Sequence, residues 1–483
     1  MKNILIAIRS IFKKGRHNVM KIVSLGIGLA VGLVLIAKVY FEQSYDDFYP
    51  DRDRVYQVWA KYQQKGGELK DYPQTSGGIA PTMQQQIPEI ETVTRYTSFG
   101  DWTFTMTDTK MKYSGRCIIA DSCFFDILPR PMLIGNAKEV LSTPMYVLIS
   151  SRIAKNIGGD VIGKNFTVDN SPGRTMTIGG VFEEVPENSH SRYDVIVSMA
   201  SAGRFMWEGS PTNMLGNDRY ISYVKLHKGV NPLALEEQVR TFVNSYFPPE
   251  EQQKVGLSID FSFHKLDNLH KELPQVKRMT WILSLLAFAL IFTAVMNYIL
   301  IVISSIVNRS KEVAVHKCYG ASENNIHGMM FGEALVHIVL SLILALLLIL
   351  AFRGTVEELL ATSLDSLLLS NGSLVLLGIC ILVFFVSGFM PGSLYARIPV
   401  ASAFRNYREN KRIWKKALLL VQFVATGFLV TMLVFVARQY TFMVNDRPGY
   451  AYENLAYCGL AGVDSTSRAK ILDEVMRLPG VVA

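Results

Sequence analysis

The sequence predicts an α-helical membrane protein that carries one large extracytoplasmic α+β domain between its first two membrane spans. Five stretches of about 20 or more mostly apolar residues are long enough to cross the hydrocarbon core of a bilayer. They are residues 19–41, 279–306, 329–352, 372–395 and 417–437. Residues 42–275, between the first two stretches, are polar and carry strand and helix patterns in alternation. These two observations predict a five-span bundle and a separate water-soluble domain.

The basic residues indicate on which side of the membrane each loop lies. Residues 1–21 contain Lys and Arg but no acidic residue, and residues 396–416 contain many basic residues and a single Glu. The loop at 353–371 is acidic instead. Because cytoplasmic loops are enriched in Lys and Arg, the N-terminus is expected in the cytoplasm. Alternation then places 42–275 and 353–371 outside, and 307–328 and 396–416 inside. The net charge of +8 is concentrated at span ends, which fits membrane lipids and predicts no nucleic-acid partner.

The first 18 residues predict a helix that lies in the cytoplasmic membrane interface. Ile4, Leu5, Ile8 and Phe12 fall on one helical face, and the lysines and arginines fall elsewhere. Such an amphipathic pattern is typical of helices whose apolar face enters the acyl boundary. A solvated tail is the alternative, but the spacing is regular enough to favour the interfacial helix.

The insert at 42–275 has the composition of a mixed α+β domain, expected to form two lobes. Residues 102–107, 175–182, 193–199 and 219–226 are rich in β-branched and aromatic residues and predict strands. Residues 151–158 and 232–247 predict helices, and Pro232 suits the first turn of the second one. Since no transmembrane pattern interrupts this segment, it is expected to fold as one extracytoplasmic unit.

The beginning of the chain recurs near its end. A basic segment, an apolar span and an aromatic, Asp-containing exit occupy residues 15–43 and again residues 410–439. The fifth span would therefore start a second repeat, and residues 438–483 would start a second, incomplete extracytoplasmic domain. We expect the chain to be a piece of a longer protein with two such halves.

No residue pattern in the chain predicts catalysis. GGDVIGKN (residues 158–165) matches the phosphate-binding pattern G-x-x-x-x-G-K-S/T except at its last position, where Asn replaces the hydroxyl that would bind Mg²⁺. A helix pattern precedes this segment and a strand pattern follows it, the reverse of the order that a phosphate loop needs. The histidines have no recognised metal spacing. The sequence therefore predicts a tight turn here, no cofactor, no metal and no enzyme.

The segment between the second and third spans predicts two short helices joined by a sharp bend. Gly320 suits the position after a helix C-terminus, and Ser322 followed by Glu323 suits the start of the next helix. A bent, charged helix pair held between two spans is a surface on which a cytoplasmic partner can push. An ordinary solvated loop is the alternative.

These residues resemble a known family. RSKEVAVHKCYGAS (residues 309–322) resembles the R-x-K-E-(I/V)-x-(I/V)-R-K-x-x-G-A-S signature of MacB/FtsX-type ABC transporter permeases. The run from Val161 to Ser198 is similar to the family's I-G-K…T-V-x-G-V…P-x-N-S-H pattern, and residues 396–406 to its short segment after a last span. His316 departs from the pattern, which usually has Arg there. The extracytoplasmic domain is accordingly expected to be of the MacB periplasmic-core type.

The resemblance implies a non-catalytic permease subunit in the inner membrane of a bacterium, beneath which a separate cytoplasmic ABC ATPase pair would bind. ATP-driven movement would pass through the cytoplasmic helices to the external domain, which leaves room for a periplasmic partner. The residues assigned to ATPase docking are Arg309, Lys311, Glu312, His316, Lys317, Gly320, Ala321 and Ser322. A membrane-anchored sensor or scaffold without an ATPase is the rival interpretation, and a membrane-anchored enzyme is disfavoured. Cargo identity stays open.

A few polar residues lie within the apolar spans. Asn297, Glu333 and His337 are functional candidates because ionisable and polar groups are expensive inside a membrane. Glu333 and His337 lie four residues apart near the inner end of the third span. We expect them to pair with neighbouring helices rather than to line a transport path.

Overall fold

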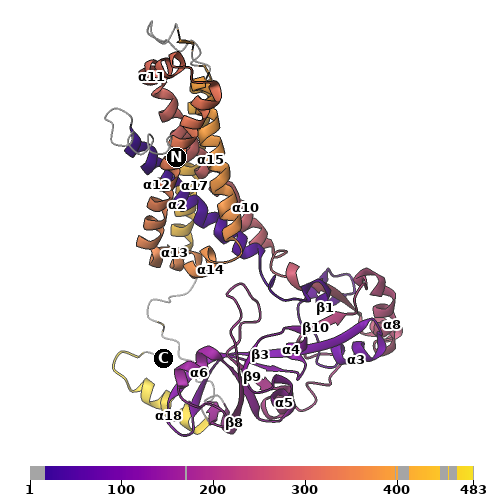
Figure 1. Cartoon of the computed structure of the whole chain (residues 1–483). Coiled ribbons are helices and arrows are strands. Elements are labelled where there is room, and N and C mark those ends of the chain that lie inside the picture. The colour runs from indigo at the N-terminus through magenta and orange to yellow at the C-terminus, as the bar shows by residue number, and fades with distance from the viewer. Residues whose placement is uncertain are drawn as a thin grey trace. The chain divides into compact units, whose positions relative to one another are not determined.

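The computed structural model describes residues 17–168, 171–396, 399–400, 413–445, 455 and 465–481 (Figure 1). It divides into two compact units, Met1–Gln43 with Leu273–Asn454 and Ser44–Glu272 with Leu455–Ala483. The expected interfacial helix at residues 1–18 falls almost wholly outside the described residues, as do most of the basic linker and much of residues 438–483. The expected repeat stays a prediction.

The first unit is a bundle of long helices. Five of them are long and apolar enough to cross a membrane, which confirms the five expected spans. They are α2 (Asn18–Gln43), α10 (Pro274–Ser304), α12 (Glu323–Ala351), α15 (Ser373–Ala396) and α17 (Ile413–Asn445). Shorter helices connect them: α11 (Ile306–Cys318), α13 (Arg353–Leu360) and α14 (Leu364–Leu368).

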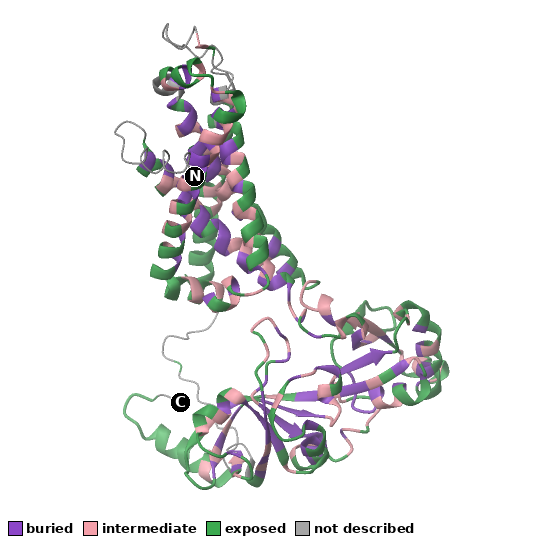
Figure 2. Cartoon of the chain, viewed as in Figure 1, coloured by how far each residue is buried: buried purple, intermediate pink, exposed green. Residues whose placement is uncertain are grey.

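Helix α2 packs against α10 and α12, and α12 packs against α15. Glycines allow the close approach of α2 to its neighbours: a Cβ added at Gly28 would lie 2.2 Å from the Cβ of Ala294 on α10. Small residues of this kind are typical of membrane helix interfaces. The buried core of the bundle includes Leu25, Leu29, Tyr298 and Ile338, whereas most described residues of α17 are exposed (Figure 2).

The second unit is built on one sheet of eleven strands, with the order β11-β1-β10-β3-β4-β9-β6-β8-β5, while β2 pairs with β1 and β7 pairs with β3 and β8. The strands are β1 (Val55–Gln64), β2 (Leu69–Tyr72), β3 (Ile90–Met106), β4 (Lys112–Ala120), β5 (Met132–Ile134), β6 (Tyr146–Ser150), β7 (Asn165–Val168), β8 (Ser171–Phe182), β9 (Val195–Ser198), β10 (Ile221–Leu226) and β11 (Leu257–Lys265). The helices are α3 (Ile79–Gln86), α4 (Phe124–Ile127), α5 (Ala137–Ser142), α6 (Ser151–Ile157), α7 (Ala202–Phe205), α8 (Glu236–Tyr246), α9 (Pro249–Val255) and α18 (Ser465–Met476). The α+β prediction is confirmed.

Strand β3 runs through both parts of the domain. Its first half pairs with β10 and joins a core made with α3 and α8, and its second half pairs with β4 and β7 around a second core. Figure 2 shows how buried residues concentrate in these strands. One 17-residue strand thus contributes side chains to both cores, while the division into two lobes stays a prediction.

The glycine-rich segment at 158–165 is a turn, as expected. Helix α6 ends at Ile157, strand β7 begins at Asn165, and Gly158, Gly159 and Gly163 have positive φ angles of 74°, 64° and 77°. A phosphate loop needs a strand before it and a helix after it, so this order is incompatible with one.

Candidate functional site

The bend between α11 and α12, residues 319–322, is defined by its backbone hydrogen bonds. The amide of Ala321 donates to the carbonyl of His316, and the amide of Gly320 donates to that of Lys317. This pair of bonds is the Schellman arrangement that ends a helix, and Gly320 takes the left-handed conformation it needs, with φ of 86°. The Ser322 hydroxyl then accepts from the amide of Asn325 and starts α12. The expected bend is confirmed, but the expected second short helix is wrong as a separate element: from Glu323 the chain continues without a break as α12 through the third span to Ala351.

Helix α11 is amphipathic. Val313 and Ala314 are buried in the bundle core, and Ser305, just before the helix, hydrogen-bonds the Tyr395 hydroxyl at the end of α15. The outward side carries Lys311, Val315, His316 and Tyr319, which we name the docking face. Tyr319, the residue directly after α11, is 89% exposed. Tyr is one of the residue types that dominate binding energy at protein interfaces.

The residues assigned to docking by sequence occupy this same stretch. Lys311, His316, Gly320 and Ser322 are exposed, and Glu312, Lys317 and Ala321 are half-buried. The side chain of Arg309 lies outside the described part of the structure. Sequence reasoning did not assign Tyr319 a role, although an aromatic residue directly before a helix-ending glycine was a usable signal.

Polar side chains link the helices inside the bundle. Lys21 of α2 forms a buried ion pair with Glu333 of α12, with 3.5 Å between Nζ and Oε1. The Tyr298 hydroxyl of α10 lies 3.1 Å from Nδ1 of His337 on α12. Both contacts join α12 to a neighbouring helix, which agrees with the expectation of helix pairing. Asn297 is exposed on α10 and is not brought to this group.

A second buried ion pair lies further along α2. Lys38 contacts Glu42 of the same helix at 2.7 Å and donates a hydrogen bond to the Thr362 hydroxyl at 2.7 Å. Sequence reasoning missed both Lys21 and Lys38. Lys21 was grouped with the basic N-terminal segment, yet its position inside an apolar helix was a signal that it needs a buried partner.

The residues that follow α2 form a joint with the segment 188–190. The Asn188 side chain donates to the carbonyl of Ser44, and the Asp46 amide donates to the Asn188 carbonyl. The buried Asp46 carboxylate accepts from the hydroxyl of Ser189 and contacts Nδ1 of His190 at 2.6 Å. We call these residues, Ser44 and Asp46 with Asn188–His190, the joint.

The joint gives a structural meaning to the N-S-H sequence run. His190 is close in sequence to Asp194, but the fold pairs it with Asp46, 144 positions earlier. The ring of Tyr45 stacks on His270, with 3.7 Å between ring centroids. The chain segment leaving α2 and the segment entering α10 are therefore held by the same small cluster. In the described residues, no group of His, Cys, Asp and Glu side chains could hold a metal ion.

Comparisons with known proteins agree with this architecture. The chain matches the MacB-like periplasmic core domain over residues 20–242 and the FtsX-like permease C-terminal domain over residues 284–400. A crystallised domain of a protein described as a permease, from Porphyromonas gingivalis, is 33% identical; the match covers 45% of this chain and 91% of that one, with a TM-score of 0.42.

Two further solved structures are more distant. The periplasmic region of MacB from Actinobacillus actinomycetemcomitans is 15% identical, and the match covers 45% of this chain and 91% of that one, with a TM-score of 0.32. The extracellular domain of the noncanonic ABC-type transporter YknZ from Gram-positive bacteria is 11% identical, with 43% and 98% covered and a TM-score of 0.30. No match to a curated protein was found.

The helix bundle and the inserted α+β domain define a multi-pass membrane protein with a large domain outside the bilayer. The two matched domains identify its class. The chain belongs to the MacB/FtsX-type ABC transporter permeases.

Proposed function

We propose that this chain is a non-catalytic permease subunit that transmits conformational change from a cytoplasmic ATPase pair to its external domain. The observation that carries the proposal is the docking face on α11. It is presented by a helix whose opposite side is packed into the bundle, so that a partner pressing on Lys311, His316 or Tyr319 would move the bundle itself.

A continuous set of contacts supports transmission through the bundle. Helix α12 begins at the bend and is paired with α2 through Lys21 and Glu333. Helix α2 continues directly into Ser44 and Asp46 of the joint. We infer that a displacement at the bend would pass along α12 to α2, and from α2 along the chain to the residues of the joint.

The proposal includes the membrane orientation. The N-terminus, the docking face and residues 396–416 would face the cytoplasm of a bacterial cell, and the external domain would lie beyond the inner membrane. Basic residues at the inner span ends would contact anionic lipid. The external domain would act on cargo or on a periplasmic partner, and nucleic acid is not a partner.

The test is a pull-down of the full-length protein from native membranes, with ATPase activity assayed on the eluate. Lys311→Glu with Lys317→Glu reverses charge on the docking helix. Lys228→Glu with Lys254→Glu, at exposed positions of the external domain, is the matched control. We expect wild type and control to recover an ATP-hydrolysing partner, and the docking variant to lose it.

Tyr319→Ala sharpens this experiment because it removes no charge. As an exposed aromatic on the docking face, Tyr319 should contribute to the contact, so we expect the recovered ATPase to fall at least tenfold. If cross-linked wild-type membranes yield no ATPase at all, the permease proposal is wrong and the sensor interpretation replaces it.

A further inference from the structure

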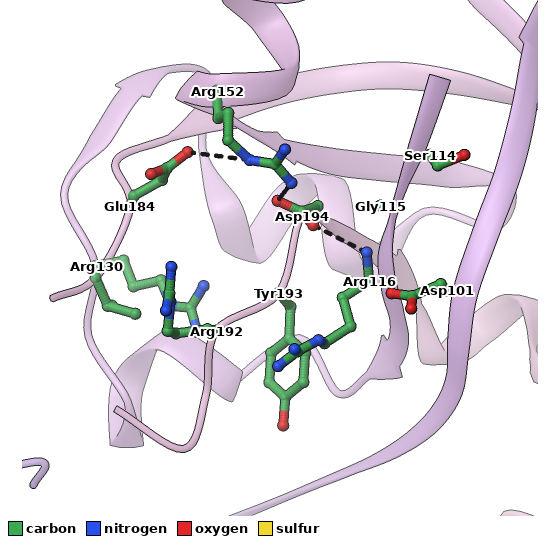
Figure 3. Close-up of a pocket in the computed structure, with 11 residues that line it drawn as sticks. Asp101, Ser114, Gly115, Arg116, Arg130, Arg152, Glu184, Arg192, Tyr193 and Asp194 are labelled. Atoms are coloured by element: carbon green, nitrogen blue, oxygen red, sulfur yellow. Dashed lines mark hydrogen bonds and ion pairs between the residues drawn. The ribbon is translucent and has the colours of Figure 1, made fainter. Parts of the chain in front are cut away.

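The external domain contains a cavity of about 400 Å³ that the proposed function does not use (Figure 3). It lies where strand β4, helix α6 and the segment leading into β9 meet. Four of the eleven residues that line it are arginines. The residues concerned are Arg116 on β4, Arg130 after α4, Arg152 on α6 and Arg192 before β9, with Asp101, Glu184, Tyr193 and Asp194 among them.

Only one of these arginines is matched to a carboxylate in the described structure. Arg152 forms an ion pair with Asp194 at 2.6 Å and a longer one with Glu184 at 3.7 Å. Asp194 is further held by the backbone amide of Arg116 at 2.9 Å. Figure 3 shows these contacts as dashed lines. The carboxylates of Asp194 and Glu184 are therefore already paired with Arg152.

The guanidinium groups of Arg116, Arg130 and Arg192 have no ion pair with any described residue. Arg116 and Arg192 are exposed, so water solvates them. Arg130 is different, because it is only 6% exposed and none of its three guanidinium nitrogens has a hydrogen-bond partner in the described structure. A buried charge without a partner is costly, and native proteins rarely keep one without a use.

Aromatic rings compensate Arg130 in part. Its guanidinium carbon lies 5.2–5.8 Å from the ring centroids of Phe124, Phe125, Phe182 and Tyr193. Cation–π contacts favour the charge, but they do not satisfy the N–H groups in the guanidinium plane. Burial lowers the pKa of Arg130, against the opposing influence of Tyr49, Tyr193 and Tyr96. Of these, the Tyr49 hydroxyl interacts most strongly with the guanidinium, although no guanidinium nitrogen reaches hydrogen-bond geometry with it.

We propose that this cavity binds one compact oxyanion, a carboxylate or phosphate group of a ligand of the external domain. Arg116 and Arg192 would contact the anion, and Arg130 would supply a fixed positive charge from behind them. The guanidinium fork matches both oxyanions in geometry. Asp101 and Glu184 at the lining limit the positive potential, which favours a single anionic group over a polyanion. We name Arg116, Arg130 and Arg192 the arginine pocket.

The arginine pocket adjoins the joint along the chain. Ser191, the residue before Arg192, hydrogen-bonds the hydroxyl of Tyr49 and the hydroxyl of Ser189. Ser189 in turn donates to Asp46. An anion bound in the pocket would therefore shift Ser191 and, through its hydrogen bonds, Tyr49 and Asp46, which follow α2 in the chain. This inference extends the proposed function. Its test uses no ATPase, so the anion site and the permease function can be disproved independently of each other.

The test measures anion binding to the full chain in nanodiscs of zwitterionic lipid. Thermal unfolding is followed by tryptophan fluorescence during titration with inorganic phosphate or with acetate, while sodium chloride keeps the ionic strength constant. A ligand that binds only the folded state raises the melting temperature in a saturable way. We expect such a rise with at least one of the two anions, and the stronger one identifies the class of ligand.

Three variants decide whether the rise comes from the arginine pocket. Arg192→Gln, at an exposed position, should weaken the apparent affinity at least tenfold. Arg130→Met should abolish the saturable rise while leaving the ligand-free melting temperature equal or higher, because a buried charge without a carboxylate partner is removed. Arg174→Gln is the matched control: this exposed arginine lies over the Phe205 ring, away from the cavity lining, and should behave as wild type.

Three results would overturn the proposal. The first is the absence of a saturable rise in wild type with either anion. The second is a rise that persists unchanged in Arg192→Gln. The third is an Arg130→Met protein that melts several degrees lower without ligand and keeps the saturable rise, since Arg130 would then be a structural cation held by its rings. If Arg130→Met does not fold, Arg192→Gln compared with Arg174→Gln decides alone.

Discussion

The helix bundle and the external domain treat buried charge in different ways. In the bundle, Lys21 is paired with Glu333, and Lys38 is paired with Glu42, all four being less than 10% exposed. In the external domain, Arg130 is equally buried but has aromatic rings and no carboxylate. Among the described residues, these two buried lysines of the bundle therefore have carboxylate partners, whereas the buried Arg130 of the external domain has only aromatic rings. The difference suggests that the bundle pairs serve contact between helices and that Arg130 serves something outside the chain.

The largest expected effect comes from breaking the Lys21–Glu333 pair. Glu333→Leu leaves the Lys21 charge buried, and we expect a loss of about 3–5 kcal/mol in the free energy of unfolding. Lys21→Leu together with Glu333→Leu removes both charges and should be nearly neutral. A double-mutant cycle on thermal or denaturant unfolding in detergent measures the coupling. If Glu333→Leu is as stable as the double variant, Lys21 does not depend on Glu333 for compensation of its buried charge.

Asp46→Asn tests a third kind of buried charge, a carboxylate in the joint. Its partners are the His190 ring and the Ser189 hydroxyl, whereas the bundle lysines have carboxylate partners and Arg130 has aromatic rings. Asn tolerates the left-handed conformation of Asp46, with φ of 57°, so the substitution removes charge without backbone strain. Loss of the charge-assisted hydrogen bonds should cost about 1.5–3 kcal/mol. The measurement is thermal unfolding of the full chain.

The exposed residue Asp71 provides the control for the joint. Asp71→Asn should leave the melting temperature unchanged. If the joint transmits movement, Asp46→Asn should also affect transport. Where a partner ATPase is recovered, this variant should bind the ATPase as wild type does but should transmit less of the ATP-driven movement to the external domain. Equal melting temperatures for the two Asn variants would contradict the role of Asp46 in the joint.

A smaller effect is expected from packing alone. Gly28→Ala would place a methyl group 2.2 Å from the Cβ of Ala294, so α2 and α10 must separate, at a cost of about 1 kcal/mol or more. Gly378→Ala on α15 meets open space and should be neutral or slightly stabilising, since Ala favours helix over Gly. Comparing the melting temperatures of the two variants isolates the helix contact. A destabilisation of equal size at both positions would contradict close packing of α2 on α10.

The smallest effect concerns an ion pair at the surface of the external domain. Hydrogen bonds from Lys225 and Arg54 lower the pKa of Asp51 below its usual value of 3.8. A depressed acid contributes stability above its unfolded-state pKa, and this contribution is lost as the pH falls through the folded-state pKa. Because the Asp51 side chain is 37% exposed, solvent screening keeps the contribution below about 1 kcal/mol.

The pH dependence of unfolding checks this sign. Asp51→Asn should melt slightly below wild type at neutral pH, and the difference should shrink as the pH is lowered below about 4. A difference that grows at acid pH would contradict the assignment.

Local patterns were sufficient for much of this protein. The five spans follow from apolar length, since a backbone inside a bilayer must satisfy its own hydrogen bonds and therefore forms helices. The bend follows from Gly320 and Ser322, because helix ends depend on the conformation and side chain of single residues. The order of helix and strand around residues 158–165 likewise follows from short-range pattern, and this order alone is incompatible with a phosphate loop.

Contacts between distant residues could not be inferred in this way. Lys21 meets Glu333 across 312 positions, and His190 meets Asp46 across 144, because the faces on which two elements pack depend on the whole fold. The aromatic rings around Arg130 come from α4, β8 and the segment before β9. No pattern within any one of these segments predicts a buried arginine.

The sequence by itself therefore determined the class of protein, its spans, the composition of its external domain and the shape of the bend. Each of these depends on residues within a few positions of one another, where composition and backbone conformation act directly. Only the tertiary structure decided that Lys21 and Lys38 have carboxylate partners and that the buried Arg130 has none among the described residues. That outcome depends on the three-dimensional neighbours of each side chain, since burial sets the cost of a charge and only a nearby partner can offset it.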